Sequence, residues 1–403
     1  VYLTNEQNDF RGTISFKGGV TLKYDTDAAL GNASFDINYT NRVLTPGGLD
    51  KVQKDSKGAL LVDRIAEENL DLSAYADLFI GAQDDTTYKG SVTIADNATY
   101  HFGAFTGKLV LEQELVARGR NNLDVDGQTF SGGEIRLDAQ TQITGDVEVR
   151  GYDQTATTPE CRPVGEITLG LGVEDAIAHV ASVTLKDGGY LNLHGHSQSI
   201  NNLAIEDGGA LKDSGKGTLN LNLTKSVTWR GSVETGTINV TATNGSTLTM
   251  AGTANYDEMR IKSGSNVALG ANNSLGVFGT TIIEKGGNLN MNGHSAEGNI
   301  IVNTGGTLSA SGSSAASVSG YVTLDGGTMS FAGAGSSMIA TSTLVSNGGV
   351  IQGNSFHING LAVFQNNKTY LKGLTSQGGI YFGGTVEIEN GASLVLQDTE
   401  FFT

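Results

Sequence analysis

The stretch IIEKGGNLNMNGHS, residues 282–295, contains the pattern that decides the fold. Gly286 is followed three residues later by Leu289 and two further on by Met291, with the polar Asn290 between them. Period-two alternation after a glycine turn is typical of a strand that follows a tight reversal. The pattern recurs through the second half of the chain, at Gly188, Gly208, Gly245, Gly264, Gly286, Gly305, Gly326, Gly348 and Gly391.

These glycines are separated by one or two multiples of about 21 residues, which indicates a repeat architecture. An apolar residue stands three positions after each of them: Leu191, Leu211, Leu248, Val267, Leu289, Leu308, Met329, Ile351 and Leu394. If each unit makes one circuit, equivalent residues stack about 4.8 Å apart and form an aliphatic ladder inside. The sequence therefore predicts an all-β fold, a right-handed parallel β-helix of roughly 15 coils.

A second ladder is expected three residues before the glycines. Its members are Leu185, Ile205, Ala242, Ile261, Ile283, Val302, Thr323, Val345 and Ile388, of which only Thr323 is polar. The first half of the chain carries the repeat more loosely, in ISFKGGVTLKY (14–24) and VTIADNATYHF (92–102). Asn97 takes the glycine place there, because asparagine tolerates the left-handed region best after glycine.

Two stretches interrupt the repeat and are expected as insertions. In residues 40–87, Leu60, Leu61, Ile65 and Leu70 approach helical spacing; in residues 151–181, the segment VEDAIAHV (173–180) suggests a short helix. Such insertions emerge as loops that either carry binding function or cover sheet edges, and both alternatives stay open. Residues 1–403 are expected to form one continuous β-helical unit.

The chain is acidic, with a formal net charge of −17, and the charge is uneven. Residues 1–200 hold 29 acids and 16 bases, whereas residues 201–403 hold 13 and 9. An acidic chain is a poor binder of polyanions, so a nucleic-acid partner is not expected. Cys161 is the only cysteine, which excludes an intramolecular disulfide, and no apolar run is long enough to span a membrane.

A set of arginines between the two interruptions is the strongest candidate for a binding site. Arg118 and Arg136 are 18 residues apart, close to one coil, and are expected to stack on one face with Arg120 and Arg150 nearby. Arginine binds sulfate and carboxylate groups bidentately, and Asp124 and Asp126 could accept hydroxyl groups. The pattern suits an extended acidic glycan. The alternative is that Asp124, Glu134, Asp138 and Glu148 pair with the arginines as surface ion pairs of little energetic value.

No catalytic or metal motif stands out, and no cofactor is expected. The chain lacks Gly-x-Ser-x-Gly and His-Glu-x-x-His, and His194 and His196 have no third ligand at zinc spacing. Parallel β-helices also include polysaccharide lyases and hydrolases that use clustered acids. Asp124, Asp126, Asp138 and Asp146 are the carboxylates that an enzyme of that type would use.

Three segments resemble the passenger domains of AIDA-type (type V) autotransporter adhesins of enterobacteria. They are LTNEQNDFRGTISFKGGVTLKYDTDAALG (3–31), VTLKDGGYLNLHGHSQSINNLAIEDGGAL (183–211) and IIEKGGNLNMNGHS (282–295). The resemblance implies a non-enzymatic protein at the bacterial cell surface, anchored to or released from the outer membrane. It also implies a C-terminal translocator barrel, which these 403 residues do not include.

The function implied by this resemblance is adhesion. The expected partners are a fibronectin-like host extracellular-matrix protein or a glycosaminoglycan, with cell aggregation and biofilm formation. Two alternatives remain: a module that only associates with the same passenger on another cell, and a β-helical polysaccharide lyase or hydrolase.

Overall fold

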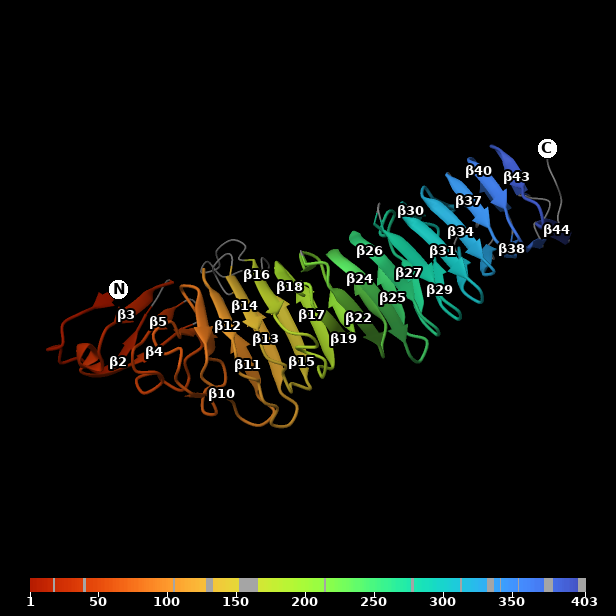
Figure 1. The fold of residues 1–403 in the computed structure, drawn as a ribbon. Coiled ribbons are helices and arrows are strands. Elements are labelled where there is room, and N and C mark those ends of the chain that lie inside the picture. The colour runs from red at the N-terminus through yellow and green to blue at the C-terminus, as the bar shows by residue number, and fades with distance from the viewer. Residues whose placement is uncertain are drawn as a thin grey trace. The chain divides into compact units, whose positions relative to one another are not determined.

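A computed structural model describes residues 1–16, 19–38, 41–103, 106–127, 133–151, 166–213, 215–276, 279–311, 314–331, 337–340, 342–353, 355–372 and 380–397. These residues form 44 strands and one 3-10 helix, η1 (Asp27–Leu30). The strands wind into a parallel β-helix of about 16 turns (Figure 1). The β-helix predicted from the glycine repeat is therefore confirmed.

The chain divides into two compact units, unit 1 (Val1–Gly215) and unit 2 (Lys216–Thr403). In unit 1, sheet A contains β1 (Tyr2–Leu3), β3 (Thr21–Tyr24), β5 (Arg42–Leu44), β6 (Ala59–Leu61), β8 (Phe79–Gly81), β11 (Thr99–Phe102), β13 (Asn122–Asp126), β15 (Asp146–Arg150), β17 (Ser182–Lys186) and β20 (Leu203–Ile205). Sheet B contains β9 (Thr86–Tyr88), β12 (Lys108–Leu111), β14 (Gly133–Leu137), β16 (Ile167–Leu171), β18 (Gly189–Asn192) and β21 (Ala210–Lys212). The strand β19 (Ser197–Asn201) also belongs to sheet B. Two short pairs, β2 (Arg11–Ser15) with β4 (Asn32–Asp36) and β7 (Leu70–Asp71) with β10 (Val92–Thr93), complete unit 1.

Unit 2 is built in the same way. Its sheet A strands are β23 (Val227–Trp229), β25 (Thr247–Met250), β27 (Asn266–Leu269), β29 (Asn288–Asn290), β32 (Thr307–Ser309), β35 (Thr328–Phe331), β38 (Gly349–Gly353), β41 (Lys368–Lys372) and β44 (Ser393–Gln397). Its sheet B strands are β22 (Thr218–Leu223), β24 (Ser232–Ala242), β26 (Ala254–Ile261), β28 (Thr280–Ile283), β31 (Asn299–Asn303), β34 (Tyr321–Asp325), β37 (Thr343–Ser346), β40 (Leu361–Phe364) and β43 (Val386–Ile388). A third sheet holds β30 (Ser295–Ala296), β33 (Ala316–Val318), β36 (Ser337–Ala340), β39 (Ser355–Ile358) and β42 (Ile380–Phe382).

The predicted inner ladder of unit 2 is present. Leu289 lies in register with Leu308, and Leu308 with Met329, and all three side chains are fully buried. The row extends over nine coils, through Val227, Leu248, Val267, Leu289, Leu308, Met329, Ile351, Leu371 and Leu396. Leu394, which was predicted for this row, pairs instead with Thr369. Each coil therefore buries one more aliphatic side chain, the main source of stability in such a stack.

Leu191 and Leu211 also point inward, but they do not belong to that row as predicted. They pair with each other on β18 and β21, in sheet B, whereas Leu289 and Leu308 lie in sheet A. The glycine turns at Gly188 and Gly208 lead into sheet B, and those of unit 2 lead into sheet A. The same sequence motif thus marks two different corners of the coil.

Where a corner carries two glycines, as at Gly286 and Gly287, the two have different tasks. Gly286 has φ +78°, in the left-handed region that glycine enters without strain. Gly287 stands where a Cβ would lie 2.3 Å from the carbonyl oxygen of Ile261 on the neighbouring coil, so no side chain fits. Asn97, which was expected to replace the corner glycine in unit 1, has φ 58° and confirms that substitution.

The second predicted ladder is present only in part. Ile261, Ile283 and Val302 share one inner row of sheet B, but Leu185 and Ile205 lie in sheet A, and the residue that pairs with Ile261 is Val240 and not Ala242. Two further members face the wrong way. Thr323 and Val345 point outward, and Leu324 and Ser346 occupy the inner row with Ile283 and Val302. The turn before Met329 is one residue shorter than the turn before Leu308. Three residues before Gly326 and Gly348 therefore stand the outward-facing Thr323 and Val345, and the inward-facing residue is one position later.

Residues 41–87 contribute strands to the coil, joined by turns, and are not the predicted insertion. In sheet A, β5, β6 and β8 pair in succession, placing Val43, Leu60 and Ile80 in one inner row. Their outward residues Leu44, Ala59, Leu61 and Phe79 form a second buried cluster. Strands buried on both faces lose the alternating pattern, which explains the helix-like spacing of their leucines.

The second predicted insertion also contains a coil strand. β16 pairs with β14 and β18, and residues 173–180 form turns and bends rather than a helix, with Asp175 at φ 51°. Pro159, Cys161 and Pro163 lie outside the described residues.

Candidate functional site

The four candidate arginines are not stacked on one face. Arg118 lies in the connection between β12 and β13, whereas the register neighbours of Arg136 on β14 are Val110 and Gly170. Arg150 belongs to β15 in the other sheet. Three of the four pair with carboxylates: Arg120 with Asp146 at 3.0 Å, Arg136 with Asp138, and Arg150 with Asp126 at 2.9 Å. The expected row of arginines is therefore wrong, and the ion-pair alternative holds for these three residues.

Arg150 is the centre of a charged network on sheet A. Besides Asp126, its guanidinium lies 3.6 Å from Asp124 and 3.6 Å from Glu148, and Glu148 contacts Lys186 at 3.1 Å. Burial alone would lower the pKa of Arg150, but the three carboxylates together raise it. Arg150 thus neutralises carboxylates on neighbouring coils. Asp124 and Asp126, which were expected to contact a ligand, form ion pairs with Arg150.

The carboxylates considered for a β-helical lyase or hydrolase are spread over three places. Asp124 and Asp126 belong to the Arg150 network, and Asp124 also lies 3.1 Å from His101. Asp138 follows β14 in sheet B, and Asp146 pairs with Arg120. These four side chains do not form one acidic cluster.

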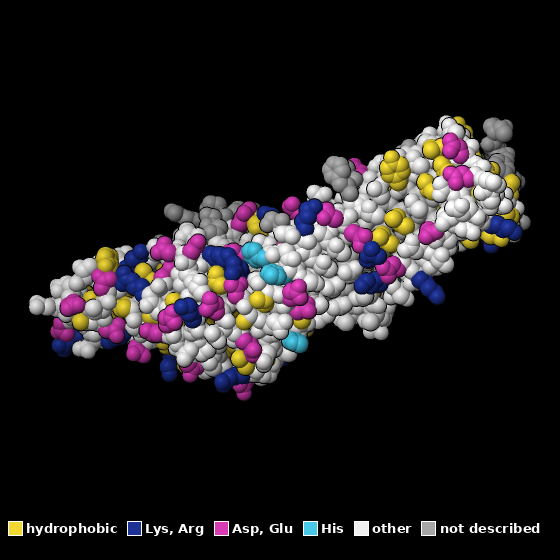
Figure 2. Space-filling view, in the orientation of Figure 1, with side chains coloured by type: hydrophobic (Ala, Val, Ile, Leu, Met, Phe, Trp, Pro, Cys, Tyr) yellow, Lys and Arg dark blue, Asp and Glu magenta, His cyan; other side chains and the backbone are white. Residues whose placement is uncertain are grey.

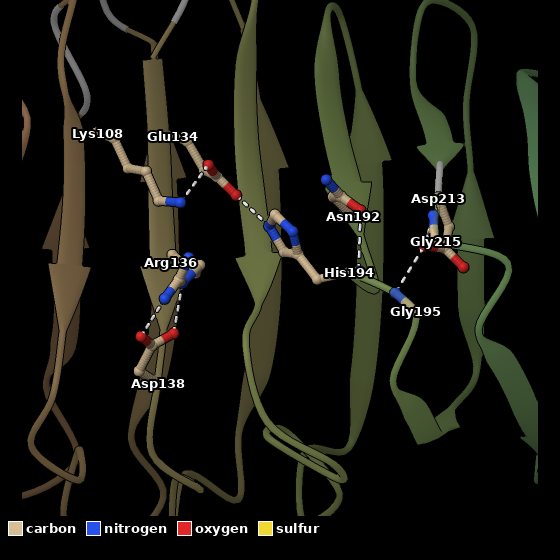
Figure 3. Close-up of polar contacts among 9 residues, drawn as sticks. All are labelled: Lys108, Glu134, Arg136, Asp138, Asn192, His194, Gly195, Asp213 and Gly215. Atoms are coloured by element: carbon tan, nitrogen blue, oxygen red, sulfur yellow. Dashed lines mark hydrogen bonds and ion pairs between the residues drawn. The ribbon is translucent and has the colours of Figure 1, made fainter.

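A second polar network crosses sheet B of unit 1. One oxygen of Glu134, on β14, accepts a contact from Nε2 of His194, and the other lies 3.4 Å from Nζ of Lys108. Figure 3 shows His194 reaching across β16 toward Glu134. The space is provided by Gly170 on β16, where a Cβ would lie 2.2 Å from Glu134 and 2.7 Å from His194.

The turn that presents His194 is built from the repeat. Asn192 Oδ1 accepts the backbone N–H of His194 at 2.9 Å, and the buried carboxylate of Asp213 accepts the N–H groups of Gly195 and Gly215 (Figure 3). His194 has φ 51°, in the left-handed region, and its counterpart Asn292 has φ 49°. Asn292 follows the same motif on β29, in sheet A. The histidine at position 194, where the other copy of the motif has asparagine, is the sequence signal that could have identified His194.

An open hollow of about 290 Å³ adjoins Glu134 at the start of three sheet B strands. It is lined by Asp85, Thr106, Gly107, Lys108, Gly133, Glu134, Glu166 and Thr168. Asp85 Oδ1 accepts the backbone N–H of Lys108 at 2.9 Å, and Glu166 Oε1 accepts the hydroxyl of Tyr190 at 2.7 Å. Burial, and next its contact with Glu166, raise the pKa of Tyr190 to about 12.

Unit 2 carries a different kind of surface, the ladder face, on the outer side of its sheet A. Its two rows consist of Thr247, Asn266, Asn288, Thr307 and Thr328, and of Thr249, Ala268, Asn290, Ser309, Ser330 and Gln352. Beyond them the first row continues with Val350 and the second with Lys372. Hydrogen bonds run along the rows, from Asn288 to Asn266 at 3.5 Å and from Gln352 to Ser330 at 3.4 Å, and between the rows, from Ser309 to Asn288 at 3.0 Å. These eleven positions carry no charge.

The net charge is concentrated in unit 1. Unit 1 contains 32 acids and 17 bases, which gives −15, and unit 2 contains 10 acids and 8 bases, which gives −2. Figure 2 shows charged side chains spread closely over unit 1 and long uncharged stretches over unit 2. A partner that approaches the ladder face therefore meets little electrostatic repulsion.

Comparison with known proteins gives no relative. No protein-family model, no curated protein and no solved structure matches this chain. Within the ranges that the structure describes, no group of three or more His, Cys, Asp or Glu side chains could hold a metal ion. The described part of the chain also contains no helix with the length and apolarity that a membrane span requires.

Proposed function

We propose that this chain is the passenger of an AIDA-type autotransporter adhesin, which acts at the bacterial cell surface by pairing with a second copy of itself. The ladder face of unit 2 is the observation that supports this proposal. Its Asn, Thr, Ser and Gln side chains each offer a donor and an acceptor, so the surface is complementary to itself. A two-fold interface needs that property, because the same patch serves both partners.

Charge and side-chain size favour the same contact. Two copies of these 403 residues repel each other with a net charge of −17 each, but the net charge of unit 2 is only −2. Serine and threonine lose little rotamer entropy when they are immobilised, in contrast to lysine or glutamate. Contacts of this kind are weak singly and become strong when many passengers on one cell meet many on another.

Attachment to a host matrix protein through the same face is the second candidate, since an extended uncharged surface also suits an uncharged region of a foreign protein. A glycosaminoglycan has less support. Three of the four arginines expected to bind it are engaged with carboxylates of unit 1, whose net charge is −15.

Sedimentation velocity over a range of protein concentrations tests the pairing. The wild type should form dimers as concentration rises, and the double variant Thr307→Asp with Gln352→Glu should remain monomeric, because it places carboxylates on both partners. Thr323→Asp with Thr343→Glu, which adds the same charge to sheet B of unit 2, is the matched control and should dimerise normally. A wild type that stays monomeric, or a control that fails equally, contradicts the proposal.

A further inference from the structure

The outer face of sheet B in unit 2 carries a row of mostly apolar side chains, the apolar row. It takes one residue from each of five neighbouring strands, β28, β31, β34, β37 and β40 (Figure 1): Ile282, Ile301, Thr323, Val345 and Val363. All but Thr323 are aliphatic, and the side chains of Ile282, Ile301 and Val345 are partly exposed. Tyr321, beside Thr323 on the same face of β34, is 56% exposed. Apolar side chains that adjoin one another on an exposed face are typical of an interaction site.

Carboxylates border the apolar row toward its C-terminal end. Asp325 is the last residue of β34, Glu387 lies on β43 in register with Val363, and Glu389 follows two positions later. All three acids are exposed, and none of them forms an ion pair with a residue that the structure describes. Asp325 and Glu389 each accept a neutral side-chain amide, at 2.8 Å and 3.2 Å. Their charges therefore remain available to a cationic partner.

No base on these strands offsets the carboxylates. The strands β28, β31, β34, β37, β40 and β43 contain no lysine or arginine. Arg260, in register with Ile282 beyond the other end of the apolar row, pairs with Glu258 at 2.6 Å and with Glu284 at 3.3 Å. Both ends of the row thus carry a surplus of negative charge. A second copy of this face would repel it, whereas a partner with apolar and basic side chains is complementary to it.

The direction of the apolar row favours a helix as the partner. The row crosses the strands, so its side chains are about 4.8 Å apart. Side chains on one face of a helix recur about every 5.4 Å, whereas those on one face of a strand recur about every 6.6 Å. The distance along the row from Ile282 to Val363 is about 19 Å, which is the length of about 13 helical residues. A helix also pairs its own backbone groups, which an extended peptide on the face of a sheet does not.

From the apolar row, the carboxylates and the spacing we propose that sheet B of unit 2 binds a cationic amphipathic helix. The apolar stripe of the helix lies on Ile282, Ile301 and Val345, and its lysine or arginine side chains reach Asp325 and Glu389. Helices with apolar residues at positions i, i+3, i+4 and i+7 are recognised in this way. The site lies on sheet B and does not involve the ladder face on sheet A, so it goes beyond the pairing of two copies and stands or falls separately from it.

Fluorescence anisotropy of labelled peptides, titrated with the full chain, tests the kind of partner. The probe is a peptide of about 14 leucine and lysine residues with the leucines at helical spacing. It should bind, and two relatives should each bind at least about tenfold more weakly: one with leucine and lysine in strict alternation, and one with glutamine in place of lysine. Equal binding of the alternating peptide overturns the helix, and equal binding of the glutamine peptide overturns the role of the cations. No binding of the probe overturns the site.

Variants separate this site from a general attraction of cations to the acidic unit 1. Ile301→Lys with Val345→Lys places cations on the apolar row and should weaken binding of the probe at least about tenfold in a chain whose circular dichroism is unchanged. Thr184→Lys with Ala204→Lys adds the same charge at two outward positions of sheet A in unit 1 and should bind the probe normally. Equal losses in both variants, or no loss in the first, overturn the assignment.

A second pair of variants tests the carboxylates. Asp325→Asn with Glu389→Gln should weaken binding of the probe about threefold or more, because two exposed ion pairs are lost. Glu206→Gln with Asp207→Asn removes the same charge from an exposed corner of unit 1 and should bind normally. Equal losses in these two variants overturn the role of the two acids.

Dimerisation distinguishes this site from the ladder face. The pairing variant Thr307→Asp with Gln352→Glu should bind the probe as the wild type does, and Ile301→Lys with Val345→Lys should still form dimers in sedimentation velocity. A row variant that no longer dimerises would assign the apolar row to a second copy and overturn the helix proposal.

Discussion

His194 contacts Glu134 across an intervening strand, although the two residues are 60 positions apart in the chain. The contact joins β14 to the turn after β18 and passes over Gly170 on β16. A side chain at position 170 would occupy that path. The contact between Glu134 and His194 therefore depends on the glycine at position 170.

Gly170→Ala should lower the free energy of unfolding by about 1–2 kcal/mol, because the new methyl group displaces Glu134 from Lys108 and His194. Thermal unfolding followed by circular dichroism measures the change. In a Glu134→Ala background the same substitution should cost less, since only the His194 ring and the Arg136 stem are then left for the methyl group to displace. Equal costs in both backgrounds would show that the methyl group strains the backbone instead.

Leu308→Asp should destabilise unit 2 by more than about 3 kcal/mol, because the carboxylate would be buried without a partner between Leu289 and Met329. Trp229, the only tryptophan, is buried in unit 2 and reports its unfolding by fluorescence. Ser309→Asp, one residue further on and facing outward, is the control and should change stability by less than about 1 kcal/mol. A wild-type transition for Leu308→Asp would contradict the observed register.

Arg150→Ala should cost about 1–3 kcal/mol, since it leaves Asp124, Asp126 and Glu148 close together without their shared cation. Chemical denaturation at pH 7 measures the loss. Arg118→Ala, at an exposed position with no ion pair to any residue that the structure describes, should stay within about 0.5 kcal/mol of the wild type.

The stability of unit 1 should fall between pH 10 and pH 12, partly through Tyr24. Burial raises the pKa of Tyr24 from 10.0 to about 12, against the lowering effect of its contact with Thr45. Because the folded state holds the proton more tightly, this stabilisation is complete below pH 10 and is lost as the pH rises through 12. Tyr24→Phe should remove a decline on the order of 2–3 kcal/mol from the unfolding free energy measured across this range. An identical pH profile for the variant would refute the assignment to Tyr24.

Most of the fold could be predicted because the repeat acts locally. A glycine turn followed by Leu289 specifies the corner and the inward side chain without any distant information. What the motif does not specify is which corner it marks, so Leu191 and Leu289 were placed in one row although they lie in different sheets. The buried outer cluster around Leu61 was also missed, because strands covered on both faces lack alternation.

The candidate site could be predicted only in part. Arg150 was found as a charged residue among carboxylates, but the spacing of Arg118 and Arg136 did not reveal that one lies in a connection and the other on a strand. The contact of Glu134 with His194 spans two coils, so no spacing rule for a single coil finds it. The contact is possible because Gly170 has no side chain. A sequence pattern of apolar and polar residues does not reveal the role of such a glycine.

The close approach at Gly287 has a wider consequence. At that corner one coil touches the next through backbone atoms alone, so the rise between coils does not depend on the volumes of the side chains inside. Leucine, valine, methionine and isoleucine can then exchange along the ladder during evolution while the pitch stays constant. The interior of this protein is free to drift in sequence as long as its corner glycines are retained, and the outer faces can diversify independently of it.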